Sequence, residues 1–198
     1  MNVVFDLGGV VVAWRPEEIV AQAFVDRDTR ALVEREIIGH PDWLELDRGS
    51  LTVDDVVVRA AVRTGLAEAE VREFIEGVPA ALVANEEVVA LVRRLHVAGH
   101  RLFCLSNMPE LSMEHLERVN DFWDLFSGAV ISSRVGHCKP EPAIYEHLIA
   151  TYQLDPSDTV FIDDVPANVT AAAAFGIRAI RFESAVQCEA ELRRLGCL

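Results

Sequence analysis

The sequence has few cysteines, few basic residues and no long hydrophobic stretch, and each shortage excludes a class of protein. The four cysteines include no CxxC pair, so we expect reduced thiols in a cytoplasmic protein. No apolar run approaches the roughly 18 residues of a membrane span, and no basic segment precedes the first apolar residues, so neither a membrane protein nor a secreted precursor is expected. The net charge of −14 argues against nucleic acid or an anionic membrane as a partner.

Apolar residues are plentiful by comparison. They make up 51% of the 198 residues, which suffices for one medium domain or for a core with a small insert. Disorder is therefore not expected.

Short apolar runs alternate with helical patterns along most of the chain, which predicts a parallel sheet connected by helices. The predicted strands are residues 3–5, 101–105, 128–131, 159–162 and 177–182. From residue 85 onward the pattern predicts helices at 86–97, 111–119, 141–152, 168–175 and 185–195.

Between the first two strands the periodicity is helical throughout, with helices predicted at 17–25, 30–38, 53–63 and 67–75 and a loop at 39–43. We interpret residues 14–82 as an all-helical module inserted after the first strand. The remaining residues, 1–13 and 83–198, then form the α/β core.

Polar residues follow three of the predicted strands directly. Asp6 ends the first, Ser106 and Asn107 end the second, and an Asp163-Asp164 pair ends the fourth. The carboxyl ends of parallel strands share one edge, where open α/β sheets bind ligands. Three carboxylates in one place repel one another unless a cation neutralises them, and Mg²⁺ suits oxygen ligands beside a phosphate.

The ordered segments Asp6-Leu7-Gly8-Gly9-Val10, Leu105-Ser106-Asn107, Lys139-Pro140 and Asp163-Asp164-Val165-Pro166-Ala167-Asn168 resemble the four motifs of the haloacid dehalogenase-like hydrolase superfamily. The helical insert resembles its small C1-type cap. The motif order covers essentially the whole chain. Asp47-Arg48-Gly49 and the segment 139–145 are similar to the bacterial α-D-glucose-1-phosphate phosphatase branch.

The resemblance implies a Rossmann-like core and a Mg²⁺-dependent phosphatase that acts on a small phosphorylated metabolite. A sugar 1-phosphate is the substrate that the resemblance favours most. Asp6 would attack phosphorus and form an aspartyl-phosphate that water hydrolyses. Ser106, together with neighbouring backbone amides, would bind the phosphoryl oxygens. Lys139 would neutralise charge on Asp6 and on the phosphate.

The resemblance also assigns the cation. Asp6, the carbonyl of Gly8 and Asp164 would bind Mg²⁺, and Asp163 would act through a metal-bound water, although the sequence does not fix the order of the two neighbours. Asn168 would orient this loop.

The substrate-binding candidates are grouped by position. Two candidates in the insert could equally have a structural role: Trp43 could pack in the core of the insert, and Arg48 could form an ion pair on the surface. The full set comprises Asn107, Gly8, Gly9, Arg48, Asp47, Trp14 and Trp43.

One position departs from the family pattern. Most phosphatases of the family carry an aspartate two residues after the nucleophile as general acid and base, and here that residue is Gly8. The leaving group could depart with little help, a residue of the insert or a water could supply the proton, or the substrate could need none. A hydrolytic 2-haloacid dehalogenase and a catalytically silent binding protein on the same scaffold are therefore alternatives.

Overall fold

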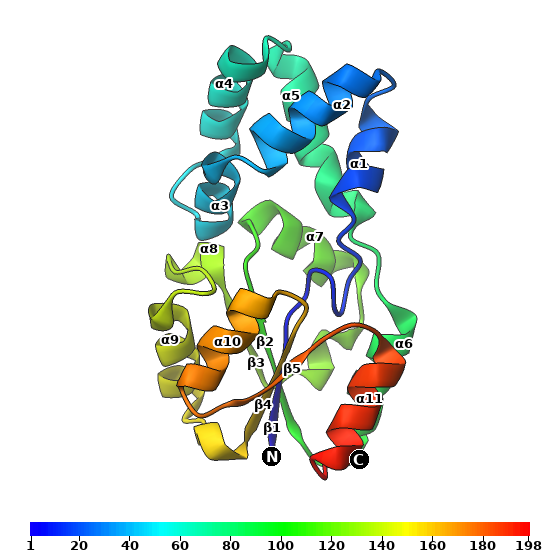
Figure 1. Cartoon of the computed structure of the whole chain (residues 1–198), viewed down its shortest axis with the longest axis vertical. Coiled ribbons are helices and arrows are strands. Elements are labelled where there is room, and N and C mark those ends of the chain that lie inside the picture. The colour runs from blue at the N-terminus through cyan, green and yellow to red at the C-terminus, as the bar shows by residue number, and fades with distance from the viewer.

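The computed structural model describes residues 1–198 and contains one five-stranded sheet in which all strands are parallel. The first strand of the chain lies in the middle of the sheet, whose order is β3-β2-β1-β4-β5 (Figure 1). This arrangement confirms the predicted α/β fold class. The strands are β1 (Asn2–Phe5), β2 (Arg101–Ser106), β3 (Gly128–Ile131), β4 (Thr159–Asp163) and β5 (Arg178–Arg181).

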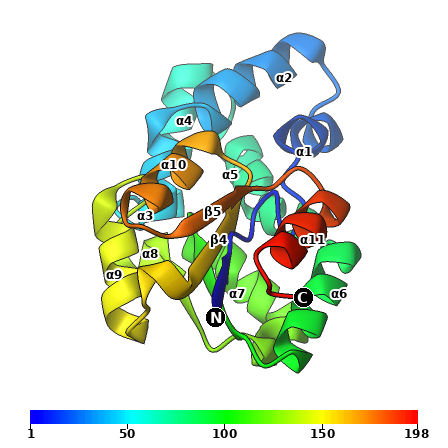
Figure 2. The same ribbon diagram turned by 60° about the horizontal axis from the view of Figure 1, so that its bottom comes forward.

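Helices cover both faces of the sheet because each central strand is apolar on both sides. In β1, Val3 and Phe5 belong to one buried cluster and Val4 to another, as the two-residue period of a strand requires. Figure 2 shows the two helical layers. One layer comprises α6 (Glu86–Val97), α7 (Glu110–Val119) and α11 (Ala185–Arg194), and the other α9 (Pro142–Tyr152) and α10 (Pro166–Ala174).

A second group of helices lies beyond the carboxyl ends of the strands, at the end of the molecule opposite to both termini (Figure 1). We call residues 16–81 the helical subdomain. It has its own cluster of buried side chains, built around Val20, Ile37 and Val57. It comprises α1 (Pro16–Ala23), α2 (Arg27–Val33), a π-helix (Glu34–Ile38), α3 (Pro41–Arg48), α4 (Val53–Thr64), α5 (Glu68–Gly77) and a 3₁₀ helix (Val78–Ala81).

The loop predicted at residues 39–43 is wrong for its second half, where α3 begins. Pro41 occupies the first helical position, which proline tolerates because its missing N–H has no partner there anyway. The His40 imidazole accepts a hydrogen bond from the Asp42 N–H at 3.1 Å and so caps the helix. Gly49 ends it in the left-handed conformation, with φ of +79°.

Four short helices complete the chain and connect its main elements. They are a 3₁₀ helix (Phe122–Leu125), α8 (Ser132–Val135), a 3₁₀ helix (Pro156–Asp158) and the 3₁₀ turn already named at the end of the subdomain. None of the helices combines the length and the apolar character needed to cross a lipid bilayer.

Candidate active site

Three carboxylates lie together where β1 and β4 end beneath the helical subdomain. Asp6 follows β1 directly, Asp163 is the last residue of β4, and Asp164 is next in the chain. The register pairs Phe5 with Ile162, so Asp6 and Asp163 end their strands side by side. One oxygen from each carboxylate lies within 4.8 Å of the other two. The structure therefore brings together the carboxylates that the sequence singled out.

Lys139, the single lysine of the chain, lies between two of these carboxylates. Its Nζ is 2.8 Å from Asp6 Oδ2 and 2.7 Å from Asp163 Oδ2, and the residue is only 3% exposed. Burial by itself lowers the pKa of the Lys139 ammonium, but the two carboxylates outweigh burial and raise the pKa overall. Burial also raises the pKa of Asp6, an effect that Lys139 opposes and Asp163 reinforces. The ammonium is thus the charge that allows two acids to be buried side by side.

Asn107 holds the loop that carries Lys139. The amide Nδ2 of Asn107 donates to the backbone carbonyl of Lys139 at 2.9 Å, and its Oδ1 accepts from the Lys139 N–H at 2.7 Å. Asn107 lines the cavity, as expected of a substrate contact, but both of its polar atoms are already engaged. These two hydrogen bonds fix the Lys139 backbone and so help to position its ammonium group.

Asp163 and Asp164 have different environments. Asp163 is fully buried and accepts hydrogen bonds from Lys139 Nζ, from the Val165 N–H at 2.8 Å and from Asn168 Nδ2, which is 3.1 Å from both oxygens. Asp164 is half-buried, lines the cavity and has no such partners. Burial and the neighbouring Asp163 raise the pKa of the Asp164 carboxyl. Asp164 is therefore the neighbour left free to bind a cation directly.

Gly9 makes room for the Asp164 carboxylate. Its φ of +77° is in the left-handed region, and a Cβ on Gly9 would collide with the oxygen Oδ2 of Asp164. A side chain at this position would be strained by the backbone conformation and would displace the Asp164 carboxylate. Gly8, one residue earlier, lines the cavity and faces Trp14.

Ser106 presents a buried hydroxyl with no hydrogen-bond partner in the protein. The residue is 1% exposed and is the last residue of β2, the strand that pairs with β1, but it is not among the residues that line the cavity. Leaving such a group unpaired costs about 1–3 kcal/mol, so the hydroxyl keeps hydrogen-bonding capacity that no protein group uses. A phosphoryl oxygen is an acceptor that could use it.

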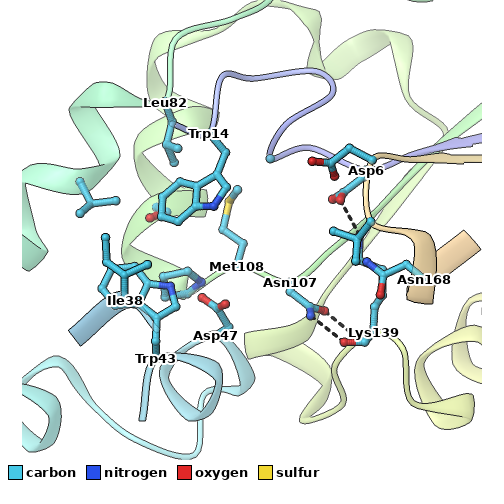
Figure 3. Close-up of a pocket in the computed structure, with 16 residues that line it drawn as sticks. Asp6, Trp14, Ile38, Trp43, Asp47, Leu82, Asn107, Met108, Lys139 and Asn168 are labelled. Carbon is cyan, nitrogen blue, oxygen red and sulfur yellow. Dashed lines mark hydrogen bonds and ion pairs between the residues drawn. The ribbon is translucent and has the colours of Figure 1, made fainter. Parts of the chain in front are cut away.

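A cavity of about 270 Å³ lies between the sheet edge and the helical subdomain (Figure 3). Its lining includes Asp6, Asn107, Lys139 and Asp164 but not Ser106 or Asp163. Its polar floor comes from the core and contains Asp6, Lys139 and Asp164. The opposite wall is apolar, and its two indoles lie 6.2 Å apart between ring centroids. That wall consists of Trp14, Ile38, Trp43, Val78, Leu82 and Met108.

Asp47 is the acidic group that the apolar side of the cavity contains. It projects from the last turn of α3 into the cavity, between Trp43 and Asn107 in Figure 3. Burial, with a further contribution from the charge of Asp6, raises the pKa of the Asp47 carboxyl to about 7.

Arg48 does not line the cavity, so the prediction that it contacts substrate is corrected. Its guanidinium is paired with both oxygens of Glu141, at 2.8 and 2.7 Å, and so bridges the helical subdomain and the core. Next to it, the Ser132 hydroxyl donates to the backbone carbonyl of Asp47, and Gly49 packs against the backbone of Ser133. We call these three contacts the α3 latch.

Sequence reasoning missed Glu141, Ser132 and the aliphatic wall of the cavity. Glu141 stands two residues after Lys139, but nothing in the sequence indicates that its partner lies 93 residues away. The wall residues Ile38, Leu82 and Met108 are ordinary apolar positions, and only the packing shows that they face a cavity.

The donor set fits a hard divalent cation. Three carboxylates with a single ammonium leave an excess of negative charge in a buried place, which a bound Mg²⁺ would balance. Asp6 and Asp164 are the carboxylates that could hold it, because Asp163 keeps its oxygens on Lys139 and Asn168.

Comparison with known proteins agrees with this geometry. A sequence model of haloacid dehalogenase-like hydrolases matches residues 1–176. A sesquiterpene phosphatase of Aspergillus oryzae is 28% identical over 195 residues, which cover 98% of this chain and 96% of that protein. A D-ribitol-5-phosphate phosphatase of Bacteroides thetaiotaomicron is 29% identical over 211 residues, which cover 96% of each.

Solved structures share the fold. A haloacid dehalogenase family enzyme of Bacteroides thetaiotaomicron, in complex with magnesium and inorganic phosphate, superimposes with a TM-score of 0.70 at 20% identity, over 92% of this chain and 93% of the other. A predicted hydrolase of the same family from Porphyromonas gingivalis has a TM-score of 0.74 at 24% identity, over 98% and 97% of the two chains.

Proposed function

Because the chain belongs to the haloacid dehalogenase-like hydrolases and is a hydrolase of phosphatase type, we propose that it cleaves a small phosphomonoester through an aspartyl-phosphate on Asp6. The observation that carries this proposal is the geometry around Lys139. The ammonium holds the Asp6 carboxylate at 2.8 Å on the cavity floor, beside a free carboxylate, Asp164. The neighbouring strand β2 ends on Ser106, whose buried hydroxyl is unpaired. In the first step an oxygen of Asp6 forms a bond to phosphorus while the bond from phosphorus to the ester oxygen breaks.

The other residues of the floor stabilise the charge of the transferring group. Lys139 and Ser106, both almost fully buried, would offer an ammonium and a hydroxyl to the phosphoryl oxygens. Mg²⁺ held by Asp6, Asp164 and the Gly8 carbonyl would supply further positive charge to these oxygens. Asn168 and Asn107 keep Asp163 and Lys139 in position. In the second step water displaces Asp6 from phosphorus and releases inorganic phosphate.

For the leaving group we propose a sugar 1-phosphate as the first candidate. The reason is Gly8, because the loop after the nucleophile Asp6 then has no side chain that could protonate the leaving group. The hydroxyl of an anomeric carbon is more acidic than an ordinary alcohol and leaves more easily. The similarity of segments 47–49 and 139–145 to the glucose-1-phosphate phosphatase branch supports the same choice.

A monophosphate with an apolar leaving group is the second candidate, and the wall of the cavity favours it. Trp14, Trp43 and their aliphatic neighbours offer a large apolar surface, whereas few polar side chains stand where sugar hydroxyls would need partners. The relative in Aspergillus oryzae that is named for a sesquiterpene substrate supports this candidate.

Charge disfavours hydrolytic dehalogenation. A 2-haloacid carries its own carboxylate, and its dehalogenation uses no metal ion, so Lys139 alone would have to balance that carboxylate together with Asp6, Asp163 and Asp164. A silent binding protein is disfavoured by the presence together of Asp6, Ser106, Lys139 and Asp164.

The four cysteines are free thiols, which supports a reducing compartment such as the cytoplasm.

The test is phosphate release from a panel of matched esters, with Mg²⁺ and with excess chelator. The panel contains glucose 1-phosphate, glucose 6-phosphate and farnesyl phosphate, with 2-chloropropionate assayed for halide release. We expect Mg²⁺-dependent turnover of glucose 1-phosphate or farnesyl phosphate and none in Asp6→Asn. Turnover of neither ester, full activity in Asp6→Asn, or halide release in chelator would each contradict the proposal.

A further inference from the structure

The proposed phosphatase reaction needs a proton at the leaving oxygen, and Gly8 cannot give it. The titratable residues that line the cavity are Asp6, Asp47, Lys139 and Asp164. Asp6 is the nucleophile, Lys139 is held between two carboxylates, and Asp164 faces the cation site. Asp47 is the remaining titratable residue of the cavity, and none of these roles occupies it.

Asp47 also lies on the side where the proton is needed. In displacement at phosphorus the attacking and leaving oxygens are roughly in line, so the leaving oxygen departs on the side away from Asp6. Asp6 is on the cavity floor, and the helical subdomain forms the opposite wall. Figure 3 shows Asp47 projecting from that wall, across the cavity from Asp6.

The surroundings of Asp47 favour its neutral form. It is the last but one residue of α3, and the carbonyl groups at a helix carboxyl end disfavour a negative charge. Its neighbour Arg48 is turned away to Glu141, so no guanidinium compensates the carboxylate. The charged groups that face it from the core are Asp6, which disfavours a carboxylate, and Lys139, which favours one. Burial and Asp6 prevail, and the pKa of Asp47 is raised to about 7, near the value that suits a proton donor at neutral pH.

We propose that Asp47 is the general acid that replaces the missing side chain at Gly8, an inference that rests on the proposed phosphatase function. As the bond between phosphorus and the ester oxygen breaks, the carboxyl proton of Asp47 passes to that oxygen and the free alcohol leaves. The resulting Asp47 carboxylate accepts a proton from the water whose oxygen bonds to phosphorus. Asp6 is released as a carboxylate, Asp47 is again protonated, and the sum is ester and water giving alcohol and phosphate.

The α3 latch explains how a residue of the helical subdomain can be held against the core with the accuracy that proton transfer needs. The Ser132 hydroxyl binds the backbone carbonyl of Asp47 itself, and the adjacent Arg48 is clamped on Glu141. Gly49 lies so close to Ser133 that any side chain would force α3 away. All three contacts fall within one turn of the proposed acid.

Leaving groups that differ in their need for a proton test the assignment. Asp47→Asn is compared with the wild type on an alkyl phosphate taken from the panel and on p-nitrophenyl phosphate, whose nitrophenolate leaves without protonation. We expect kcat/KM to fall about 100-fold or more for the alkyl ester and no more than about 3-fold for the aryl ester. Because the variant also lacks the base of the second step, the aryl ester should give a burst of nitrophenol followed by slow turnover. Asp28→Asn, the same change at an exposed site of α2, is the matched control and should alter kcat/KM of neither ester.

Two outcomes overturn the assignment while leaving the phosphatase proposal in place. An equal loss of kcat/KM on both esters would show that Asp47 binds substrate or shapes the cavity. No loss on the alkyl ester would show that the proton comes from elsewhere. A wild-type protein that hydrolyses neither ester would instead refute the phosphatase function itself, and the proton donor with it.

Discussion

Replacing Lys139 by methionine should both destabilise the fold and make its stability depend on pH and Mg²⁺. Methionine nearly fills the space of the lysine side chain but removes the ammonium that lies 2.8 Å from Asp6 and 2.7 Å from Asp163. Two buried carboxylates then face each other without a cation. Removing one partner of a buried ion pair costs about 3–5 kcal/mol. For a chain of this length, where 1 kcal/mol shifts Tm by about 2–4 °C, we expect a decrease of about 6–20 °C at neutral pH.

The sign of the pH dependence follows from the two carboxylates. Without Lys139 the pKa of Asp6 in the folded protein is raised by burial and by the charge of Asp163 above its value in the unfolded chain. The variant therefore loses little stability below the pKa of Asp6 in the unfolded chain, where Asp6 is protonated in both states, and loses stability as the pH rises through the pKa of Asp6 in the folded protein. Because the pKa of Asp6 is already raised to about 7 in the wild type, the Tm difference between wild type and variant should widen mainly as the pH rises above 7. Mg²⁺ should narrow it, because a cation at Asp6 and Asp164 restores positive charge.

Thermal unfolding followed by circular dichroism, with Mg²⁺ and with chelator, measures these differences. The control is Arg94→Met, which removes an exposed cation that pairs with both oxygens of Glu189 at 2.8 and 2.6 Å. An exposed pair is worth about 0–1 kcal/mol, so this variant should lose no more than about 4 °C. A Lys139→Met protein that unfolds within 2 °C of the control, or whose deficit is the same at pH 5 and pH 8, would refute the electrostatic reasoning.

Three further predictions concern the surroundings of the reacting groups. Asn168→Ala leaves Asp163 without two of its hydrogen bonds and should lower kcat by about 10–100-fold with little change in KM, measured with the best ester of the panel. Trp14→Ala removes part of the apolar wall and should raise KM for farnesyl phosphate about 10-fold while leaving inhibition by inorganic phosphate unchanged. Arg48 lowers the pKa of Glu141 to about 2, so the stability that the wild type has over Glu141→Gln should be present above pH 4.5 and vanish as the pH falls towards 2. Urea unfolding at several pH values should show an advantage of about 1 kcal/mol at neutral pH, since the pair is partly exposed to solvent.

The floor of the site could be predicted from the sequence because its determinants are local. An apolar run such as Val3–Phe5 forms a buried strand, and the residue that ends it must lie at the sheet edge where its neighbours also end. Asp6, Ser106 and Asp163 follow from that rule alone. What no local rule supplies is the division of work between Asp163 and Asp164, which depends on Asn168 and Lys139 closing around the first.

The beginning of α3 shows a different limit. Gly39, His40 and Pro41 are typical of a loop, and the sequence gives no strong apolar period to oppose that interpretation. The helix forms because proline fits its first position, His40 caps it, and Trp43 and Leu46 are buried in the helical subdomain. Tertiary packing thus stabilises a helix that the local sequence alone does not specify.

Asp47 and Arg48 were equivalent candidates in the sequence, and the geometry of a helix forces them apart. Consecutive residues of an α-helix point about 100° away from each other, so both side chains cannot enter one cavity. The direction is decided by Glu141, which stands on the core where it can take both ends of the Arg48 guanidinium. Because the Arg48 guanidinium is paired with Glu141 outside the cavity, no cation of α3 lies near the Asp47 carboxylate to neutralise it. The same ion pair that fastens the helical subdomain therefore also leaves Asp47 in the state in which it can give a proton to a leaving group.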